Sequence, residues 1–388
     1  MNYSSISPVN KSLLDDKQLA SFNDENVAIV KYLPQDFKVF EITDRALLKS
    51  IKKQKSGAYS IFMLEKTNIS QFSAVKIIAK QFGIQEKNIS FAGTKDKRAV
   101  TRQLISVKQL KRTPQTLTLE KENWSIYLTK LGYLYKPLSL GDLKGNKFSI
   151  IVRGRSLSLK PFFNKIPNYF HDQRFGVFGN NSLVGRLLVK GKFEKALTLI
   201  KKSGVESIPL PSGRSEAIKS LRSINKKLLR LYISAFQSKI FNDAVAKWVK
   251  DNYNYYEVDY GLGKLAFIKD LDFTGRQPIL KLRNRKVILP GFGFEPRGSI
   301  GKYIEREMRR ADVSQRDFII RTLPEMSAEA VERDLFVDVK DIKTSFNHDV
   351  VSEEGNRYLK IEFELGKGSY ATLVLSALLG RKVITWRQ

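Results

Sequence analysis

The chain has 388 residues, 42% hydrophobic and 11% aromatic, which is enough to fill sizeable cores and favours two compact units over disorder. Its 68 Lys and Arg against 39 Asp and Glu give a formal net charge of +29, which indicates a polyanionic partner, nucleic acid first and an anionic membrane surface second. The absence of cysteine and the presence of only two histidines exclude disulfides, thiolate nucleophiles, zinc–sulfur sites and a His-rich metal site.

The first third of the chain predicts a mixture of strands and helices. Residues 27–42 read as strand, turn and strand, with Pro34 at the turn. Apolar residues spaced as on one helix face predict a helix over 73–82 that ends at Gly83. The basic stretch 49–55 is expected to lie exposed ahead of that first helix. Further strands are expected at 89–92, 103–107, 124–128 and 148–152.

The predicted secondary structure changes near Asn168, from a mixture of strands and helices to mainly helices. Residues 183–237 have a mainly helical periodicity, and Leu221, Ile224, Leu228, Leu231 and Tyr232 predict one amphipathic stripe. Another helix is expected at 300–310, and strands return at 335–339 and 358–363 before a closing helix at 371–379. A helix-rich block between two mixed parts indicates a domain inserted into another domain.

The chain lacks the sequence signals of several other classes of protein. The chain shows no phosphate loop and no dinucleotide-binding fingerprint, so no nucleotide cofactor is expected. It contains no uninterrupted apolar run long enough to span a bilayer, and its start is polar. We therefore expect a cytoplasmic protein that acts without a membrane, a metal or a cofactor.

One short segment carries the strongest chemical signal. Asp96 follows a turn that begins at Gly93 and has Lys95, Lys97 and Arg98 around it. Nearby cations keep a carboxylate ionised, and an ionised carboxylate in a basic loop can serve as a nucleophile or as a base. The residues alone leave open the alternative of a structural acid that balances a basic turn.

Six motifs in order along the chain resemble the TruD family of pseudouridine synthases. Residues 93–103, with the sequence GTKDKRAVTRQ, resemble the signature of that family. Residues 31–37 resemble K-x-x-P-E-D-F, with Gln35 in place of Glu, and residues 167–176 resemble P-N-Y-F-G-x-Q-R-F-G, with His171 where Gly is common. The other three motifs are Leu143–Phe148, Leu289–Gly291 and Gly368–Thr372.

This resemblance implies a fold and a reaction. The fold would be α+β: a pseudouridine synthase catalytic domain with a mixed or antiparallel sheet flanked by helices, formed by residues 1–171 and 340–388, and an inserted helix-rich domain over 172–339. The reaction would isomerise uridine to pseudouridine in tRNA, most typically at position 13, with Asp96 as the catalytic carboxylate and no cofactor. The substrate tRNA would be the main partner of a monomeric enzyme.

The motifs also imply residues that bind the substrate. A uridine within folded RNA must leave its stack before a carboxylate can reach it, and a flipped base favours an aromatic face. Tyr370 is the first candidate for that ring and Phe148 the second; Asn146 offers its amide to the uracil edge, Phe37 packs nearby, and Lys31 is a cation beside Asp96. Ordinary core packing is the alternative for the three rings, and a solvated surface position is the alternative for Lys31.

Other functions remain open from the sequence. The enzyme could modify another RNA site, such as tRNA position 35, or the chain could be a catalytically silent RNA-binding protein; a membrane-surface protein is the remaining class. The presence of Asp96 favours an active enzyme. The basic segments 190–202, 219–230 and 297–310 of the inserted block could contact RNA phosphates, although such runs are often only solvated helix faces.

Overall fold

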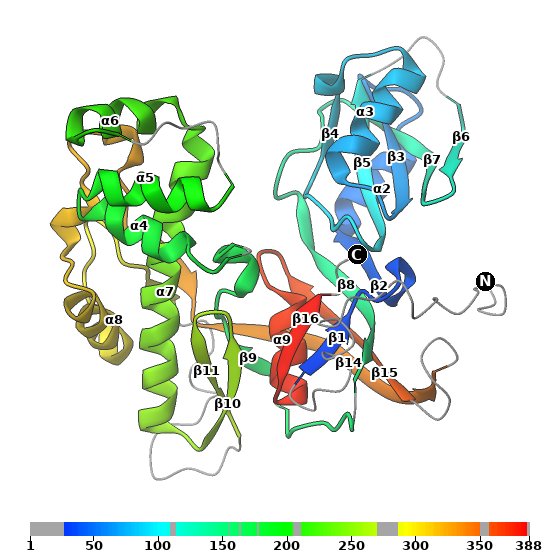
Figure 1. Cartoon of the computed structure of the whole chain (residues 1–388). Helices are drawn as coiled ribbons and strands as arrows, with labels where there is room; N and C mark the ends of the chain where they lie inside the picture. The colour runs from blue at the N-terminus through cyan, green and yellow to red at the C-terminus, as the bar shows by residue number, and fades with distance from the viewer. Residues whose placement is uncertain are drawn as a thin grey trace. The chain divides into compact units, whose positions relative to one another are not determined.

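The computed structural model describes eight stretches of the chain, which divide into two compact units. The described residues are 27–108, 114–154, 156–162, 164–176, 178–204, 211–269, 286–349 and 357–385. Unit 1 comprises residues 1–158, 338–371 and 383–388, and unit 2 comprises residues 159–337 and 372–382 (Figure 1). The expected domain boundaries, after residues 171 and 339, stay a prediction, because a division by packing does not show which parts fold alone.

Unit 1 is built on a large mixed sheet. Its elements are β1 (Val27–Val30), η3 (Pro34–Asp36), β2 (Phe37–Thr43), α2 (Arg45–Lys53), β3 (Tyr59–Thr67), α3 (Gln71–Phe82), η4 (Glu86–Asn88), β4 (Ile89–Phe91), β5 (Val100–Lys108), β6 (Thr116–Lys121), β7 (Trp124–Leu134), β8 (Leu143–Arg153), β15 (Arg357–Gly366), and most of β14 (Phe336–His348) and β16 (Lys382–Thr385). The strands lie in the order β6-β7-β3-β5-β2-β8-β15-β14, and β1 pairs with β8 and β16. The β2–β5 pair is parallel, whereas the β2–β8, β3–β5 and β3–β7 pairs are antiparallel, so the expected α+β class with a mixed sheet is confirmed.

Two apolar cores cover opposite faces of the sheet around β3. Phe62 and Leu64 pack with Val75 and Ile78 of α3, and Ile61 packs with Ile51 of α2. Because side chains alternate along a strand, neighbours 61 and 62 necessarily point to opposite faces. The helices α2 and α3 therefore lie on the two sides of this sheet, and the segment that follows α3 leads into β4, which joins the sheet beside β5.

Unit 2 is helix-rich. Its helices are α4 (Asn181–Val189), α5 (Phe193–Lys202), α6 (Arg214–Ser223), α7 (Lys226–Asn252), α8 (Gly298–Arg310) and α9 (Ala371–Leu379), with short 3-10 turns η5 (Asp172–Arg174), η7 (Gln315–Phe318) and η8 (Pro324–Met326). Its strands are β9 (Lys165–Pro167), β10 (Tyr255–Tyr260), β11 (Gly263–Ile268), β12 (Lys286–Ile288) and β13 (Glu332–Asp334), of which β10 pairs with β11 and β12 with β13.

The long helix α7 is the centre of unit 2. The helices α4 and α8 and the strand β11 pack against it, as Figure 1 shows. A Cβ at Gly185 would lie 2.1 Å from the carbonyl oxygen of Tyr232, so only glycine permits the close approach of α4 to α7. This packing explains why α7 buries residues on nearly every side of its middle, among them Ala235, Phe241 and Ala244.

Two sequence expectations need correction. The basic stretch 49–55 is not simply an exposed segment ahead of the first helix: it overlaps α2, whose lysines face outwards while Ile51 is buried. The stripe from Leu221 to Tyr232 is not one helix face either, because α6 ends at Ser223 and α7 begins at Lys226. The side chain of Asn225 accepts a hydrogen bond from the backbone N–H of Lys227 (2.9 Å) and so starts a new helix within the apolar pattern.

The helices expected in the first third and in the last part of the chain are both present. The helix expected at 73–82 is α3, and Gly83 follows it in the left-handed conformation with φ 66°. The expected closing helix at 371–379 coincides with α9. The strand β16 that follows α9 was not anticipated.

Candidate active site

Parallel pairing of β2 and β5 brings two loops together at one edge of the sheet in unit 1. Lys38 of β2 pairs with Val100 of β5. The segment 31–36 leads into β2 and the segment 92–99 leads into β5, so the two segments arrive at the same end of neighbouring strands. This is how two motifs that lie about sixty residues apart in the sequence come to share one site.

Lys31 and Asp96 form an ion pair across these two loops. The Nζ atom of Lys31 lies 2.5 Å from Oδ1 of Asp96 and 4.2 Å from the centre of the Phe37 ring. The side chain of Lys31 is 6% exposed and that of Asp96 is 33% exposed. A mostly buried ammonium is poorly screened by water, so this contact holds in place a carboxylate that still reaches the surface.

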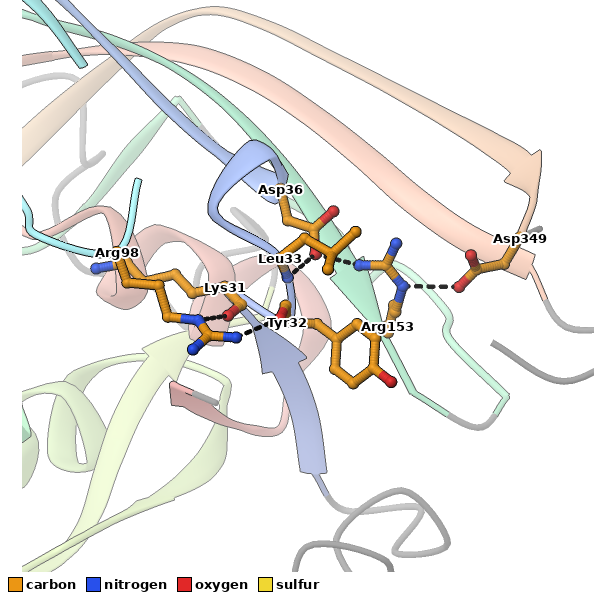
Figure 2. Close-up of polar contacts among 7 residues, drawn as sticks. All are labelled: Lys31, Tyr32, Leu33, Asp36, Arg98, Arg153 and Asp349. Atoms are coloured by element: carbon orange, nitrogen blue, oxygen red, sulfur yellow. Dashed lines mark hydrogen bonds and ion pairs between the residues drawn. The ribbon is translucent and has the colours of Figure 1, made fainter. Parts of the chain in front are cut away.

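The backbone of Lys31 is held by the loop of Asp96. Lys31 has φ 59°, a left-handed conformation that side-chain-bearing residues adopt only when their surroundings enforce it. Arg98 donates from Nε to the carbonyl of Lys31 (2.7 Å) and from a terminal guanidinium nitrogen to the carbonyl of Tyr32 (2.6 Å), as Figure 2 shows. Each loop therefore holds the other: Arg98 fixes the peptide of Lys31, and the Lys31 side chain returns to Asp96.

A second carboxylate of the first motif has a different environment. Asp36 and Asp349 both bind Arg153, the latter at 2.8 Å from its Nε, and all three side chains are 3% exposed or less (Figure 2). Asp36 also accepts a hydrogen bond from the backbone N–H of Leu33 (2.7 Å). Burial raises the pKa of Asp36, and Arg153 opposes that shift without cancelling it. This trio ties β8 and the residue after β14 to the loop that carries Lys31, but it is sealed from any substrate.

Polar side chains of β2, β3 and β5 contact the loop that carries Asp96. Lys95 Nζ lies 2.7 Å from Oε2 of Glu41 on β2, and Gln103 of β5 donates to the carbonyl of Gly93 (3.1 Å). Lys66 of β3 donates from Nζ to the carbonyl of Asp96 (2.6 Å). Lys66 is paired with Thr101, and Leu64 with Gln103, so these side chains share one face of the sheet.

No role was predicted from the sequence for Glu41, Lys66 or Gln103. Arg98 was expected as one of the cations around Asp96, whereas it donates to the carbonyls of Lys31 and Tyr32. Arg98 and Gln103 lie inside the quoted signature but carry no chemistry by themselves. Lys66 had a usable signal, because it continues the inward alternation of Phe62 and Leu64 along β3. A lysine at an inward position of an otherwise apolar strand is unusual and predicts a specific partner.

Asn146 and Phe148 lie on the same face of the sheet as Glu41. Asn146 is paired with Glu41, and Phe148 with Val39 on β2 and Phe363 on β15. In the part of the chain that the structure describes, Oδ1 of Asn146 is buried and accepts no hydrogen bond. The preceding Gly145 is needed for close strand contact, because a Cβ there would lie 2.1 Å from the carbonyl oxygen of Leu365.

The rings of Phe37 and Phe148 form part of an aromatic row. Their centroids lie 6.2 Å apart in an edge-on arrangement, and Phe148 stacks on Phe363 at 5.3 Å. Both Phe37 and Phe148 are buried. In this conformation the row is a wall behind Lys31, and neither ring presents an open face.

The structure brings five of the six candidate residues into one neighbourhood. Lys31, Phe37 and Asp96 are in direct contact, and Asn146 and Phe148 adjoin them through the strand registers given above. Tyr370 lies beyond the end of β15 and is half-buried. Among the described residues, no hydrogen bond, ion pair or ring contact joins Tyr370 to the other five.

In unit 2, the three basic segments fall mainly on helices. Residues 190–202 include α5, residues 219–230 span the end of α6 and the start of α7, and residues 297–310 include α8. Arg309 and Arg310 pair with Glu305 and Glu307 on the same helix, so part of the α8 charge is neutralised locally. Across the stretches of chain described, none of the helices combines the length and the apolar character needed to cross a membrane.

Comparisons with known proteins agree with the motifs. The model of the family described as "tRNA pseudouridine synthase D (TruD)" matches residues 20–207 and 210–378. A probable tRNA pseudouridine synthase D from Thermococcus sibiricus is 29% identical, over 90% of this chain and 94% of that protein, and the tRNA pseudouridine synthase D of Aquifex aeolicus is 28% identical, over 90% and 97%. The crystal structure of a putative tRNA pseudouridine synthase D from Methanosarcina mazei superposes with a TM-score of 0.66 at 25% identity and covers 92% of this chain and 95% of that one. The chain belongs to the TruD family of pseudouridine synthases.

Proposed function

We propose that this TruD family protein converts uridine to pseudouridine in tRNA, at position 13, with Asp96 as the reactive carboxylate. One observation carries the proposal: Asp96 is a partly exposed carboxylate whose position is fixed from both sides, by the Lys31 ammonium and by the loop contacts of Arg98 and Lys66. The neighbouring carboxylates Asp36 and Glu41 are buried in ion pairs and cannot meet a substrate.

The chemistry needs no group from outside the chain. In the isomerisation, the bond between C1′ and N1 breaks, the uracil turns, and a bond between C1′ and C5 forms. The proton on C5 then leaves and N1 gains a proton, so that substrate and product have the same composition. The Asp96 carboxylate can add to the sugar, add to the base or accept a proton, and each of these roles requires its ionised form.

The surrounding residues suit a flipped uracil. Oδ1 of Asn146 is buried without a partner among the described residues, so it would accept a hydrogen bond from the N3–H of uracil once the entering base displaces the side chains that cover it. Tyr370 is half-buried, whereas Phe37 and Phe148 are buried, so Tyr370 is the candidate whose ring can stack on the base without prior movement of the core. Phe37 and Phe148 then act as the wall that keeps Lys31 against Asp96.

The charge of the chain suits an RNA substrate. A net charge of +29 gives an affinity for phosphates that depends on the release of counterions and so falls steeply with salt. Lysine and arginine on α5, at the start of α7 and on α8 are the candidates for phosphate contacts in unit 2. We assign them to binding and not to chemistry.

The test is pseudouridine mapping on a defined substrate. Purified protein is incubated with a tRNA transcript that has uridine at position 13, and with a matched transcript that has cytidine there. Pseudouridine at position 13 of the first transcript alone is the expected result. Modification at another uridine, such as position 35, would change the assigned site, and tight binding without any modification would indicate a silent RNA-binding protein.

A further inference from the structure

Lys66 is a fully buried lysine that contacts the backbone of Asp96. Its side chain extends from β3 into the interior on the face that carries Leu64 and Gln103, and the residue has no exposed surface. Its Nζ donates hydrogen bonds to two backbone carbonyls, that of Asp96 at 2.6 Å and that of Ile69 at 2.8 Å. Lys66 therefore links the start of α3 to the peptide of the proposed reactive residue.

A buried lysine without an ion pair is costly and requires an explanation. Lysine is almost never fully buried unless it is paired, because burial removes the hydration of the ammonium group. Among the described residues, Lys95 pairs with Glu41 and Lys31 with Asp96, while Lys66 pairs with no carboxylate and donates to two backbone carbonyls. A methionine would fill a similar volume at lower cost, so core packing does not account for this residue.

We propose that Lys66 is a positioning residue for the pseudouridine reaction, and that its positive charge fixes the backbone of Asp96 while Lys31 holds the carboxylate. This inference rests on the proposed function of Asp96. A hydrogen bond from a charged donor is roughly twice as strong as one from a neutral donor. Loss of the charge should therefore loosen the Asp96 peptide and with it the position of the Asp96 carboxylate.

The charge of Lys66 is sensitive to moderately alkaline pH. Burial lowers the pKa of Lys66 to about 8, the charge of Asp96 opposes this shift, and the charges of Lys95 and Lys31 add to it. Glu41 offsets Lys95 from the β2 side. The ammonium is thus present below pH 8 and is lost as the pH rises through that value, so the rate of the bound complex should fall with a midpoint near pH 8.

The first experiment compares Lys66→Met with Lys121→Met, which removes the same charge from an exposed position on β6. Single-turnover rates on a tRNA transcript are measured with enzyme in excess, from neutral to alkaline pH, together with RNA affinity and thermal unfolding. We expect Lys66→Met to lower the rate at neutral pH by about 10- to 100-fold, to abolish the alkaline decline, and to leave RNA affinity within a few-fold. Lys121→Met should keep both the rate and the decline.

The absence of cysteine from the chain allows a chemical rescue. In Lys66→Cys, the single thiol can be alkylated in denaturant with 2-bromoethylamine to give an aminoethyl side chain, and the protein is then refolded. This amine is more acidic than that of lysine. The rescued protein should be more active than the unalkylated Lys66→Cys variant, and its alkaline decline should begin at a lower pH than in the wild type.

The outcomes separate this inference from the proposed function. If the wild-type protein forms no pseudouridine, the proposed function fails. If the wild type is active but its rate stays flat well above pH 8, or a folded Lys66→Met variant has the wild-type rate and pH profile, the role of Lys66 is overturned. The wild-type profile gives this answer even if no substitution at position 66 folds.

Discussion

Asp96 and Asp36 are two aspartates of unit 1 that each pair with a cation, but one is accessible to a substrate and the other stabilises the structure. Asp96 pairs with Lys31 and keeps a third of its side chain exposed, whereas Asp36 pairs with Arg153 and is fully buried. Both lie in loops that the sequence motifs identify, and both have a cation at contact distance. They differ in whether a second molecule can reach the carboxylate.

The difference between the two aspartates shows that ion pairing alone does not indicate a reactive group. Asp36 and Asp349 both pair with Arg153, so that trio holds the loop 31–36 against the sheet. Asp96 is held instead through its neighbours, because Arg98 fixes the facing backbone and Lys66 fixes its own carbonyl. The carboxylate of Asp96 therefore stays partly exposed, while contacts to the neighbouring backbone determine its position.

The largest effect should come from Asp96→Asn. The amide has nearly the same shape but cannot act as a nucleophile or as a base, so we expect pseudouridine formation to fall by about 10³-fold or more. Affinity for tRNA should remain within a few-fold of the wild type, because it depends mainly on phosphate contacts. Turnover and binding measured on the same transcript check this expectation.

The next largest effect should be on stability, in Asp36→Asn. This change removes one charge from a buried trio and leaves the Arg153 guanidinium short of a partner, which should lower the free energy of unfolding by about 3–5 kcal/mol. Chemical denaturation would measure it. A variant as stable as the wild type would show that Asp36 has no structural role.

The partner of Asp96 could be predicted from the sequence, whereas the partners of Asp36 could not. The signature around Asp96 and the motif that begins at Lys31 identified both partners of the Lys31–Asp96 pair, and the geometry places them 2.5 Å apart. The contacts of Arg153 with Asp36 and Asp349 could not be predicted, since they depend on which strands become neighbours over separations of 117 and 196 residues. Helix α2 was missed because its lysines obscured the short apolar face around Ile51, and the break between α6 and α7 was missed because the apolar spacing continues through it.

A smaller effect is expected for Lys31→Met. Loss of the buried ammonium should release the Asp96 carboxylate from its fixed position and reduce turnover by about 10- to 100-fold, equivalent to about 1–3 kcal/mol. The pair Lys247–Asp251 on α7 is a matched control: its atoms are 2.6 Å apart and its aspartate is 32% exposed, but its lysine is 41% exposed. Lys247→Met should leave turnover unchanged, since exposed ion pairs contribute little.

An effect of the same order as that of Lys31→Met is expected for Tyr370→Ala. Stacking on a base contributes about 1–3 kcal/mol, so turnover should fall by about 5- to 150-fold, while overall affinity for tRNA changes less. Tyr370→Phe keeps the ring and should remain close to the wild type. If Tyr370→Ala weakens binding strongly and turnover little, Tyr370 is a docking contact and does not hold the flipped base.

The most direct test compares Asp96→Asn and Asp36→Asn under single-turnover conditions on a tRNA transcript, with the rate divided by the folded fraction of each protein. We predict that Asp96→Asn unfolds like the wild type and forms no measurable pseudouridine, and that Asp36→Asn unfolds more readily yet reacts at close to the wild-type rate per folded molecule. A folded Asp96→Asn protein that reacts at the wild-type rate would contradict the assignment of Asp96 as the reactive carboxylate.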